Sequence, residues 1–503
     1  MSLGGCLAPQ VIDPAASAVA PAAAVVNDSC DPTGTPFGFG DGSSGTPFHI
    51  CSVAQLQNVQ NDVTKNYKLE ADLDLTGVTF NPIGDGVTGY SGTFDGNNHT
   101  ISNWSFTTPS CSAFAGGGGS RLESNSPTYI DYNEGFFRIL ANNGVVENLT
   151  LANVSMLGCY YTGALVGYMK TGSLVSNCNA TTNGLAANVA DTSILTGIIV
   201  GYNNLPVGGG SGHTGGLVGE AQAGSTITLS NFSGLVRGAM HVGGLVGETY
   251  GTVTLSSSSG AGVSGDGNSG GLIGNLGAGS ASLSYSTMTV FQTGGNAGGF
   301  VGSVNGGATV TSSYYNGDVN GPAGMGGFVG YVSGAGSKVS KCYSLGTVTS
   351  TNGLVGGFAG WVIKGGAIED SYTLSAVTYN SDSTWGQPSG AGGFAGVVDR
   401  NGDAGSASLN RVYAAGSIIL GTGGLVVNAD LTNKVGTAGV VTNSFANSNI
   451  STNGFINLIQ GTVTGSSALS TANMKIQASY TGWDFTNVWT IAPAVNSGYP
   501  TLR

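Results

Sequence analysis

A short glycine-bracketed apolar block recurs along this chain at nearly constant spacing. The block reads GGLVG from Gly215 and from Gly243, and other copies replace the leucine or valine by another apolar residue. Successive blocks begin 28, 27, 28, 28, 30 and 36 residues apart, at Gly215, Gly243, Gly270, Gly298, Gly326, Gly356 and Gly392. Such a period indicates one supersecondary unit stacked many times, because so small a unit buries its apolar face only against its neighbours.

The segments between blocks predict strands. Residues 226–230 and 252–256 alternate polar and apolar side chains, which is typical of strands with one buried face. A propeller blade needs about 40 to 50 residues, so the shorter repeat predicts an all-β, single-stranded parallel β-solenoid, a right-handed β-helix. Glycine suits the corners of such coils, and its missing side chain lets them stack closely.

Degenerate copies of the block extend the array. They start at Gly135, Gly163, Gly197 and Gly423. The step from Gly163 to Gly215 is 52 residues, close to two periods. We therefore expect an insertion in this step, in the glycine-rich segment 203–214.

The ends of the array predict caps, which solenoids need over their terminal coils. Ser52 and Gln55 form a capping box that predicts a short helix, with a strand after it. A second brief helix is expected from Ser470 to Ile476. Trp483, Phe485 and Trp489 then supply apolar area to close the last coil.

We expect four parts along the chain. A flexible tether covers residues 1–45, and a cap with the first coils and an irregular insertion covers 46–134. Solenoid repeats cover 135–460, and the C-terminal cap covers 461–503.

Charge is sparse throughout. Only 8% of the residues are charged, against about 25% in average proteins, and 14 Lys and Arg stand against 26 Asp and Glu. With no basic cluster to neutralise phosphates, nucleic acid is not an expected partner. No apolar run reaches eighteen residues, so no membrane span is expected.

The cysteines fall into three groups by context. Cys6 ends a segment, LGGC, that resembles a bacterial lipobox, and it is either the acylated residue of a lipoprotein or a chance cysteine in a tail. Lipid at Cys6 would be the only membrane attachment. The remaining assignments are a Cys30–Cys51 disulfide across a Gly- and Pro-rich loop, a Cys111–Cys159 pair, and buried thiols at Cys178 and Cys342.

The repeat also resembles a known family. The GG(L/F)(V/I/A)G blocks, followed by segments such as KVSKCYSLGTV at 338–348, are similar to the GLUG motif of bacterial surface proteins. The resemblance extends to YSGTFDGNNHTISN at 90–103 and to GWDFTNVW at 482–489. It implies a β-solenoid in an exported protein of the cell surface or outer membrane, or a secreted one, whose repeats act as a stalk or adhesive surface, in some members beside a protease.

Candidate chemistry is scarce. The histidines His49, His99, His213 and His241 form no HExxH pair, and we interpret each as a surface residue. Asp72 and Asp74 share one face of an expected strand, and they, with Asp95, are candidates for calcium binding or acid–base chemistry. The simpler interpretation is that they fix turns. We expect no catalytic residue, no cofactor and no resident metal.

One row of hydroxyl groups supports a separate hypothesis. Aligned coils place TxT-like pairs on one outer face, namely Thr226 and Thr228, Thr252 and Thr254, Ser280 and Ser282, and Thr309 and Thr311. Such ladders can order water on an ice-binding surface, although threonine is also a common polar strand residue.

The leading functional hypothesis is a non-enzymatic exported protein that binds a glycan or a cell-surface protein. One alternative is a polysaccharide lyase or hydrolase, which would need acidic and basic residues from adjacent coils to converge in a cleft. The other alternative is ice binding through the TxT-like ladder.

Overall fold

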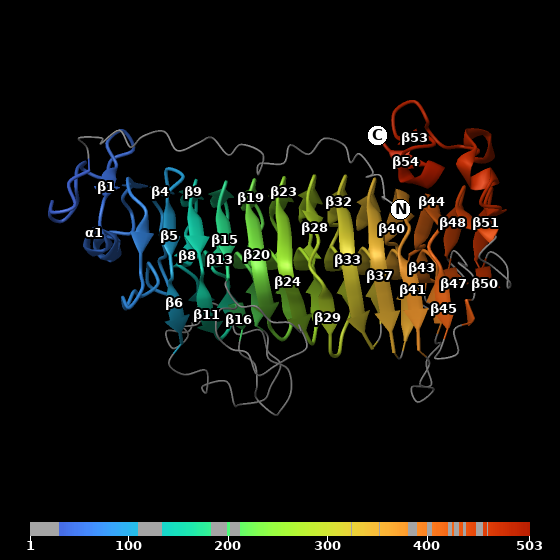
Figure 1. Ribbon diagram of the computed structural model, residues 1–503, viewed down its shortest axis with the longest axis horizontal. Coiled ribbons are helices and arrows are strands. Elements are labelled where there is room, and N and C mark those ends of the chain that lie inside the picture. The colour runs from blue at the N-terminus through green and yellow to red at the C-terminus, as the bar shows by residue number, and fades with distance from the viewer. Residues whose placement is uncertain are drawn as a thin grey trace.

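The computed structural model describes residues 30–108, 133–182, 199–201, 212–322, 324–351, 353–380, 390–399, 405–420, 425–426, 432–435, 439–448, 456–459 and 461–503. These residues form one elongated stack of β-coils that runs from the N-terminal cap to the C-terminal cap (Figure 1). Within this part of the chain, no helix is long and apolar enough to cross a membrane.

One coil shows how the stack is built. It runs through β17 (His213–Gly215), β18 (Val218–Ala221), β19 (Thr226–Thr228) and β20 (Asn231–Arg237), and the next coil begins at β21 (His241–Gly243). Each strand pairs in parallel with its equivalent in the next coil, as β17 does with β21. The predicted parallel β-solenoid is therefore confirmed.

The coils form three sheets. Sheet I contains β7 (Asn133–Glu134), β12 (Tyr161–Thr162), β17, β21, β25 (Asn268–Gly270), β30 (Ala297–Gly298), β34 (Met325–Gly326), β38 (Leu354–Gly356) and β42 (Gly390–Gly392). Sheet II contains β8 (Phe137–Leu140), β13 (Val166–Met169), β18, β22 (Val246–Thr249), β26 (Ile273–Gly277), β31 (Val301–Asn305), β35 (Val329–Ser333), β39 (Ala359–Ile363), β43 (Ala395–Val398), β47 (Thr432–Val435) and β50 (Ile456–Ile459).

Sheet III is the largest and carries the remaining strands of the coils. It includes β19, β23 (Thr252–Thr254), β27 (Ser280–Ser282) and β32 (Thr309–Thr311) in one column, and β20, β24 (Ser257–Gly265), β28 (Tyr285–Ser286), β33 (Tyr314–Gly321) and β37 (Tyr343–Ser350) in the next. In Figure 1 these strands lie side by side in the middle of the body.

The glycine block forms the corner between sheets I and II. A Cβ atom on Gly215 would lie 1.9 Å from the carbonyl oxygen of Val218 and 2.7 Å from the amide nitrogen of Gly247 in the next coil. Gly243 is equally confined, and neither residue has a positive φ. The block therefore requires glycine because backbones approach closely, and the left-handed conformation plays no part there.

Apolar ladders fill the interior of the coils. The ring of Phe300 stacks on that of Phe328 with 4.8 Å between centroids, and the stack continues to Phe358 and Phe394. All four rings are completely buried. Parallel in-register pairing aligns residues one repeat apart, so an apolar position of the block becomes a continuous core.

β13 pairs directly with β18, with Val166 opposite Val218, so the 52-residue step is a single enlarged coil; most of the segment 203–214, where the insertion was expected, lies outside the described residues. The expectations for the blocks at Gly197 and Gly423 are wrong. The segment after Gly197 forms β16 (Ile199–Gly201) in sheet III and is no corner. The segment after Gly423 forms β46 (Leu425–Val426), which pairs antiparallel with β45 (Ile418–Leu420). The sequences at Gly197 and Gly423 thus resemble the block, but neither segment pairs with the corner strands of sheets I and II.

The N-terminal cap contains the expected helix. α1 (Val53–Asn58) begins after Ser52, whose side chain accepts a hydrogen bond from the backbone N–H of Gln55. A disulfide joins Cys30 to Cys51, the pair put forward from the sequence, and the ring of Phe37 stacks on that of Phe48. The tether expected over 1–45 therefore does not include residues 30–45, which fold against the cap.

The C-terminal cap does more than close the last coil. A 3-10 turn (Asn473–Lys475) stands where a short helix was expected, and Trp489 lies buried against Tyr372 and Tyr413. The Tyr413 hydroxyl donates to the carbonyl oxygen of Pro500 over 2.6 Å. The cap therefore packs on the flank of several coils, as the red elements above β40 (Ala367–Thr373) and β44 (Ser408–Ala414) show in Figure 1.

The other cysteine assignments have different outcomes. Cys178 and Cys342 are completely buried free thiols, as expected. Cys159 is disulfide-bonded. Its expected partner Cys111 and the lipidation candidate Cys6 lie outside the described residues.

Candidate functional site

The aspartates singled out from the sequence lie in the N-terminal coils and hold local structure. Asp72 accepts hydrogen bonds from the Thr100 backbone N–H and pairs with His99, and Asp74 accepts from Asn103 and Thr76. Asp95 accepts from the backbone N–H of Asn97 and from the side chain of Asn148. These bonds are those of turn-fixing residues, and calcium binding at Asp72, Asp74 and Asp95 stays a prediction.

The hydroxyl ladder exists as aligned pairs. Thr226 lies opposite Thr252, Thr252 opposite Ser280, and Ser280 opposite Thr309, after which Lys338 takes the position. The hydroxyls of Thr254 and Ser282 lie 3.0 Å apart and bond to each other. Ice binding stays a prediction of this row.

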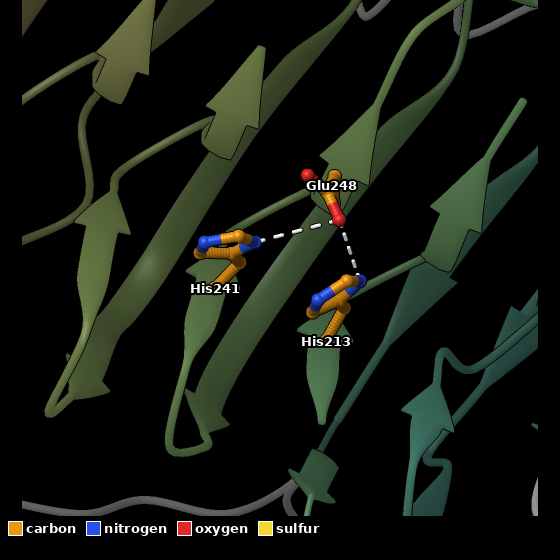
Figure 2. A group of neighbouring side chains, drawn as sticks. All are labelled: His213, His241 and Glu248. Atoms are coloured by element: carbon orange, nitrogen blue, oxygen red, sulfur yellow. Dashed lines mark ion pairs between the residues drawn. The ribbon is translucent and has the colours of Figure 1, made fainter. Parts of the chain in front are cut away.

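A cluster that the sequence analysis missed lies at the corner between sheets I and II. His213 on β17 and His241 on β21 occupy equivalent positions, and their rings stack with centroids 4.7 Å apart. Glu220 on β18 and Glu248 on β22 are likewise in register. Figure 2 shows both imidazoles pointing toward Glu248 across the corner. We call these four residues the His–Glu cluster.

The four groups of the cluster meet through a few atoms. His213 Nδ1 lies 2.8 Å from Glu220 Oε2 and 2.9 Å from Glu248 Oε2, and His241 Nδ1 lies 3.5 Å from the same Glu248 oxygen. His213, Glu220 and Glu248 expose only 7%, 5% and 5% of their surface. The expectation that His213 is a surface residue is therefore wrong.

Neighbouring side chains hold Glu248 in place. Its other carboxylate oxygen, Oε1, accepts hydrogen bonds from the Tyr250 hydroxyl at 2.9 Å and from Asn275 Nδ2 at 2.6 Å. On the preceding coil, Tyr161 lies in register with His213, and Tyr168 lies in register with Glu220. The tyrosines of the preceding coil thus lie on one side of the cluster, and the amide of Asn275 from the following coil lies on the other.

The charges in the cluster shift the pKa values of His213 and Glu248. Burial by itself lowers the pKa of His213, but the hydrogen bonds and charges of Glu220 and Glu248 outweigh it and raise that pKa to about 9. Burial disfavours the charged form of Glu248, yet its bonds to His213 and His241 and their charges hold its pKa well below the usual range. His213 and Glu248 are therefore ionised at neutral pH.

The sequence did contain a signal for this cluster. A histidine stands two residues before, and a glutamate five residues after, the first glycine of the blocks at Gly215 and Gly243. The next coil carries Asn268 and Asn275 at these two positions. Two consecutive repeats with the same ionisable pair mark a shared site, because stacking brings equivalent positions together.

A tyrosine ladder forms a second surface feature, on sheet III. The rings of Tyr285, Tyr314, Tyr343, Tyr372 and Tyr413 stack in this order at 5.0 to 5.1 Å between centroids. The C-terminal cap buries the last rings, whereas those of Tyr285 and Tyr314 are half-buried. Ser257 and Asn231 precede Tyr285 in the same column and are bonded to each other.

The fold and these features define a parallel β-solenoid repeat protein with capped ends. No family model matches the chain. A curated protein similar to it is Halomucin from Haloquadratum walsbyi, 30% identical over 207 residues that cover 38% of this chain and 2% of that protein. The chain thus spans about 2% of the length of this relative.

Two solved structures are also similar. One, from Bacteroides ovatus and provisionally described as an immunoglobulin A1 protease, is 18% identical, with 92% of this chain and 94% of that chain covered and a TM-score of 0.29. The other, an IgA1 protease, is 18% identical over 69% of this chain and 23% of that chain, with a TM-score of 0.39. At these TM-scores neither likeness says anything about the activity of this chain.

Proposed function

We propose that this chain is an exported, non-enzymatic β-solenoid of the GLUG type that presents one flank as an adhesive, glycan-binding surface. The tyrosine ladder is the observation that carries the proposal. At the end of the ladder away from the C-terminal cap, the rings of Tyr285 and Tyr314 lie beside the hydroxyl and amide groups of Ser257 and Asn231. Rings of this kind match the apolar face of a sugar, and the adjacent polar groups match its hydroxyls.

The disulfides support export. Cys30 is bonded to Cys51, and Cys159 is also disulfide-bonded. Disulfides persist in oxidising compartments and are rare where thiols are kept reduced. The sparse charge of the chain fits a surface wetted by hydroxyl and amide groups. A location at the cell surface or outer membrane, or secretion, belongs to the same proposal.

The experiment compares glycan-array and cell-adhesion binding of the full chain with that of a Tyr285→Ser, Tyr314→Ser variant. Serine is the residue of the preceding coil at the Tyr285 position, so the coil should keep its fold. We expect binding to fall at least tenfold.

Tyr331→Ser is the matched control. Tyr331 is a half-buried tyrosine on sheet II whose preceding coil also carries a serine, Ser303. Binding should be unchanged in this variant. The proposal is wrong if the wild-type chain binds no glycan or cell surface, or if the double variant binds as the wild type does.

The enzyme hypothesis has one observation in its favour. Ionisable side chains from adjacent coils do converge, in the His–Glu cluster, although they are buried and bonded to one another. Incubation with acidic and neutral polysaccharides, followed by assays for new reducing ends and for unsaturated products, tests it. Turnover that Glu220→Gln or Glu248→Gln abolishes would favour an enzyme over the adhesive function.

A further inference from the structure

We propose that the His–Glu cluster binds one divalent transition-metal cation, with His213 Nδ1, His241 Nδ1 and a carboxylate oxygen of Glu248 as ligands. This site is separate from the tyrosine ladder and does not depend on the proposed function. Among the residues that the structure describes, His213, His241 and Glu248 are the one group of three or more His, Cys, Asp and Glu whose ligand atoms converge, all within 4.8 Å.

The first support is that the imidazole nitrogens of the cluster carry too few protons to bond every carboxylate contact that they make. His213 Nδ1 carries one proton or one lone pair, yet two carboxylate oxygens lie within 2.9 Å of it. The Glu248 oxygen among them also faces His241 Nδ1, a buried nitrogen that makes no hydrogen bond. At most two protons can lie among these four atoms, whereas a cation beside them would be bound by His213 Nδ1, His241 Nδ1 and the Glu248 oxygen together.

The second support is the spacing of the ligand atoms. Zinc is bound by histidine nitrogen at about 2.0–2.1 Å and by carboxylate oxygen at about 2.0–2.2 Å, so two ligands of a tetrahedral ion lie about 3.4 Å apart. His241 Nδ1 and the Glu248 oxygen lie 3.5 Å apart, and the contact of 2.9 Å between His213 Nδ1 and the same oxygen needs to open by about half an ångström. Small rotations of the glutamate side chains provide this.

The third support is the charge of the buried groups. Glu220 and Glu248 bring two carboxylates into a region nearly free of water, and a divalent cation that displaced the proton of His213 Nδ1 would supply the positive charge that compensates them. The hydrogen bonds from Tyr250 and Asn275 fix the orientation of Glu248, as outer contacts do around metal ligands. Two imidazoles favour zinc and its first-row neighbours over calcium or magnesium, which prefer oxygen.

A metal at this position would link two coils. His213 and Glu220 belong to one coil, and His241 and Glu248 belong to the next. Metal binding would therefore stabilise the folded chain, by an amount that grows with the logarithm of the free metal concentration above the Kd. The coil with His213 directly follows the enlarged coil, in which the regular repeat is interrupted.

The test uses the full chain, treated with a chelator and dialysed, and titrated with ZnCl₂ in a calorimeter. We expect one zinc ion per chain, and a rise in the melting temperature at saturation. Cobalt(II) in place of zinc should give the intense visible absorption of a four-coordinate ion.

The variant His241→Asn, Glu248→Asn removes two ligands and installs the residues that the next coil carries as Asn268 and Asn275. Its fold should therefore survive, as circular dichroism would show, while zinc affinity falls at least 100-fold. His99→Ala is the control, because His99 pairs with the single carboxylate of Asp72 on the N-terminal coils. Its zinc binding should match the wild type.

Two results would overturn the proposal. One is a wild-type chain that takes up no zinc and no cobalt at micromolar concentration. The other is a double variant that binds zinc as tightly as the wild type, which would place the metal elsewhere. A loss of binding in His99→Ala equal to that in the double variant would have the same meaning.

Discussion

Glu134 offers a sharp test of the electrostatics of the solenoid interior. This residue of β7 is completely buried, and its carboxylate accepts hydrogen bonds from the Thr108 hydroxyl at 3.0 Å and the Cys159 backbone N–H at 3.2 Å. Burial disfavours the charged form more than these bonds and the charge of Arg138 favour it, so the pKa of Glu134 rises from 4.5 to about 7.

The direction of the effect on stability follows from this rise. Below pH 4.5 the carboxyl is protonated in both the folded and the unfolded chain, so it has no effect. Above pH 7 it is ionised in both, and folding then carries the full penalty of burying the charge. A shift of 2.5 pH units corresponds to about 3 kcal/mol. Ionisation of Glu134 should therefore cost the wild-type chain this much stability as the pH rises from 4.5 to 8.

The perturbation is Glu134→Gln. The amide keeps an oxygen for the Cys159 N–H and can donate to the Thr108 hydroxyl, and it has no charge to bury. Urea denaturation at several pH values gives the free energy of unfolding of both proteins. Because all other groups titrate in both, the difference between them isolates Glu134. We expect the variant to gain about 3 kcal/mol relative to the wild type between pH 4.5 and pH 8. A difference that does not change with pH would refute the reasoning.

Three further predictions concern the backbone and the cap, each measured by thermal or urea unfolding. Gly243→Ala should cost more than about 3 kcal/mol, because its Cβ would lie 1.9 Å from a carbonyl oxygen, whereas Gly45→Ala, in open space, should change little; equal effects would contradict the close-approach explanation. Leu255→Asn should stabilise the chain by about 1 kcal/mol, because this exposed leucine has φ 51° and asparagine tolerates that conformation better; a loss of stability would mean that the leucine is held by packing. Replacing Cys30 and Cys51 by alanine should cost about 3 kcal/mol from the loop entropy of a 21-residue separation, and an unchanged unfolding midpoint would show that the loop is ordered without the bond.

Much of the fold could be predicted because the repeat is local and strict. The spacing of the blocks at Gly215, Gly243 and Gly270 fixes the length of a coil, and the alternation within 226–230 fixes which residues face inward. These patterns depend only on a residue's place within its own repeat. The interpretation of Gly197 and Gly423 as blocks was wrong, because a glycine-rich segment resembles a block even where it forms no corner between sheets I and II.

The candidate site could not be predicted in the same way. Taken alone, the sequence shows His213 and His241 as isolated histidines without a metal-binding spacing, since the usual motifs describe one helix or one loop. The C-terminal cap is a similar case. Trp489 was expected to close the last coil, but it packs against Tyr372, 117 residues earlier in the chain. Such contacts depend on how a terminal segment folds back, which no periodicity encodes.

By itself, the sequence determined the coil. Its glycines are placed where two backbones nearly touch, its apolar residues form ladders inside, and both follow from the period. Tertiary structure decided which outward side chains meet. The corner at the block of Gly215 turns β17 toward β18, so that His213 and Glu220 on either side of the corner converge. Parallel stacking then places His241 and Glu248 of the next coil beside them. Two histidines and two glutamates, dispersed over 36 residues of sequence, are thereby gathered around a few shared atoms.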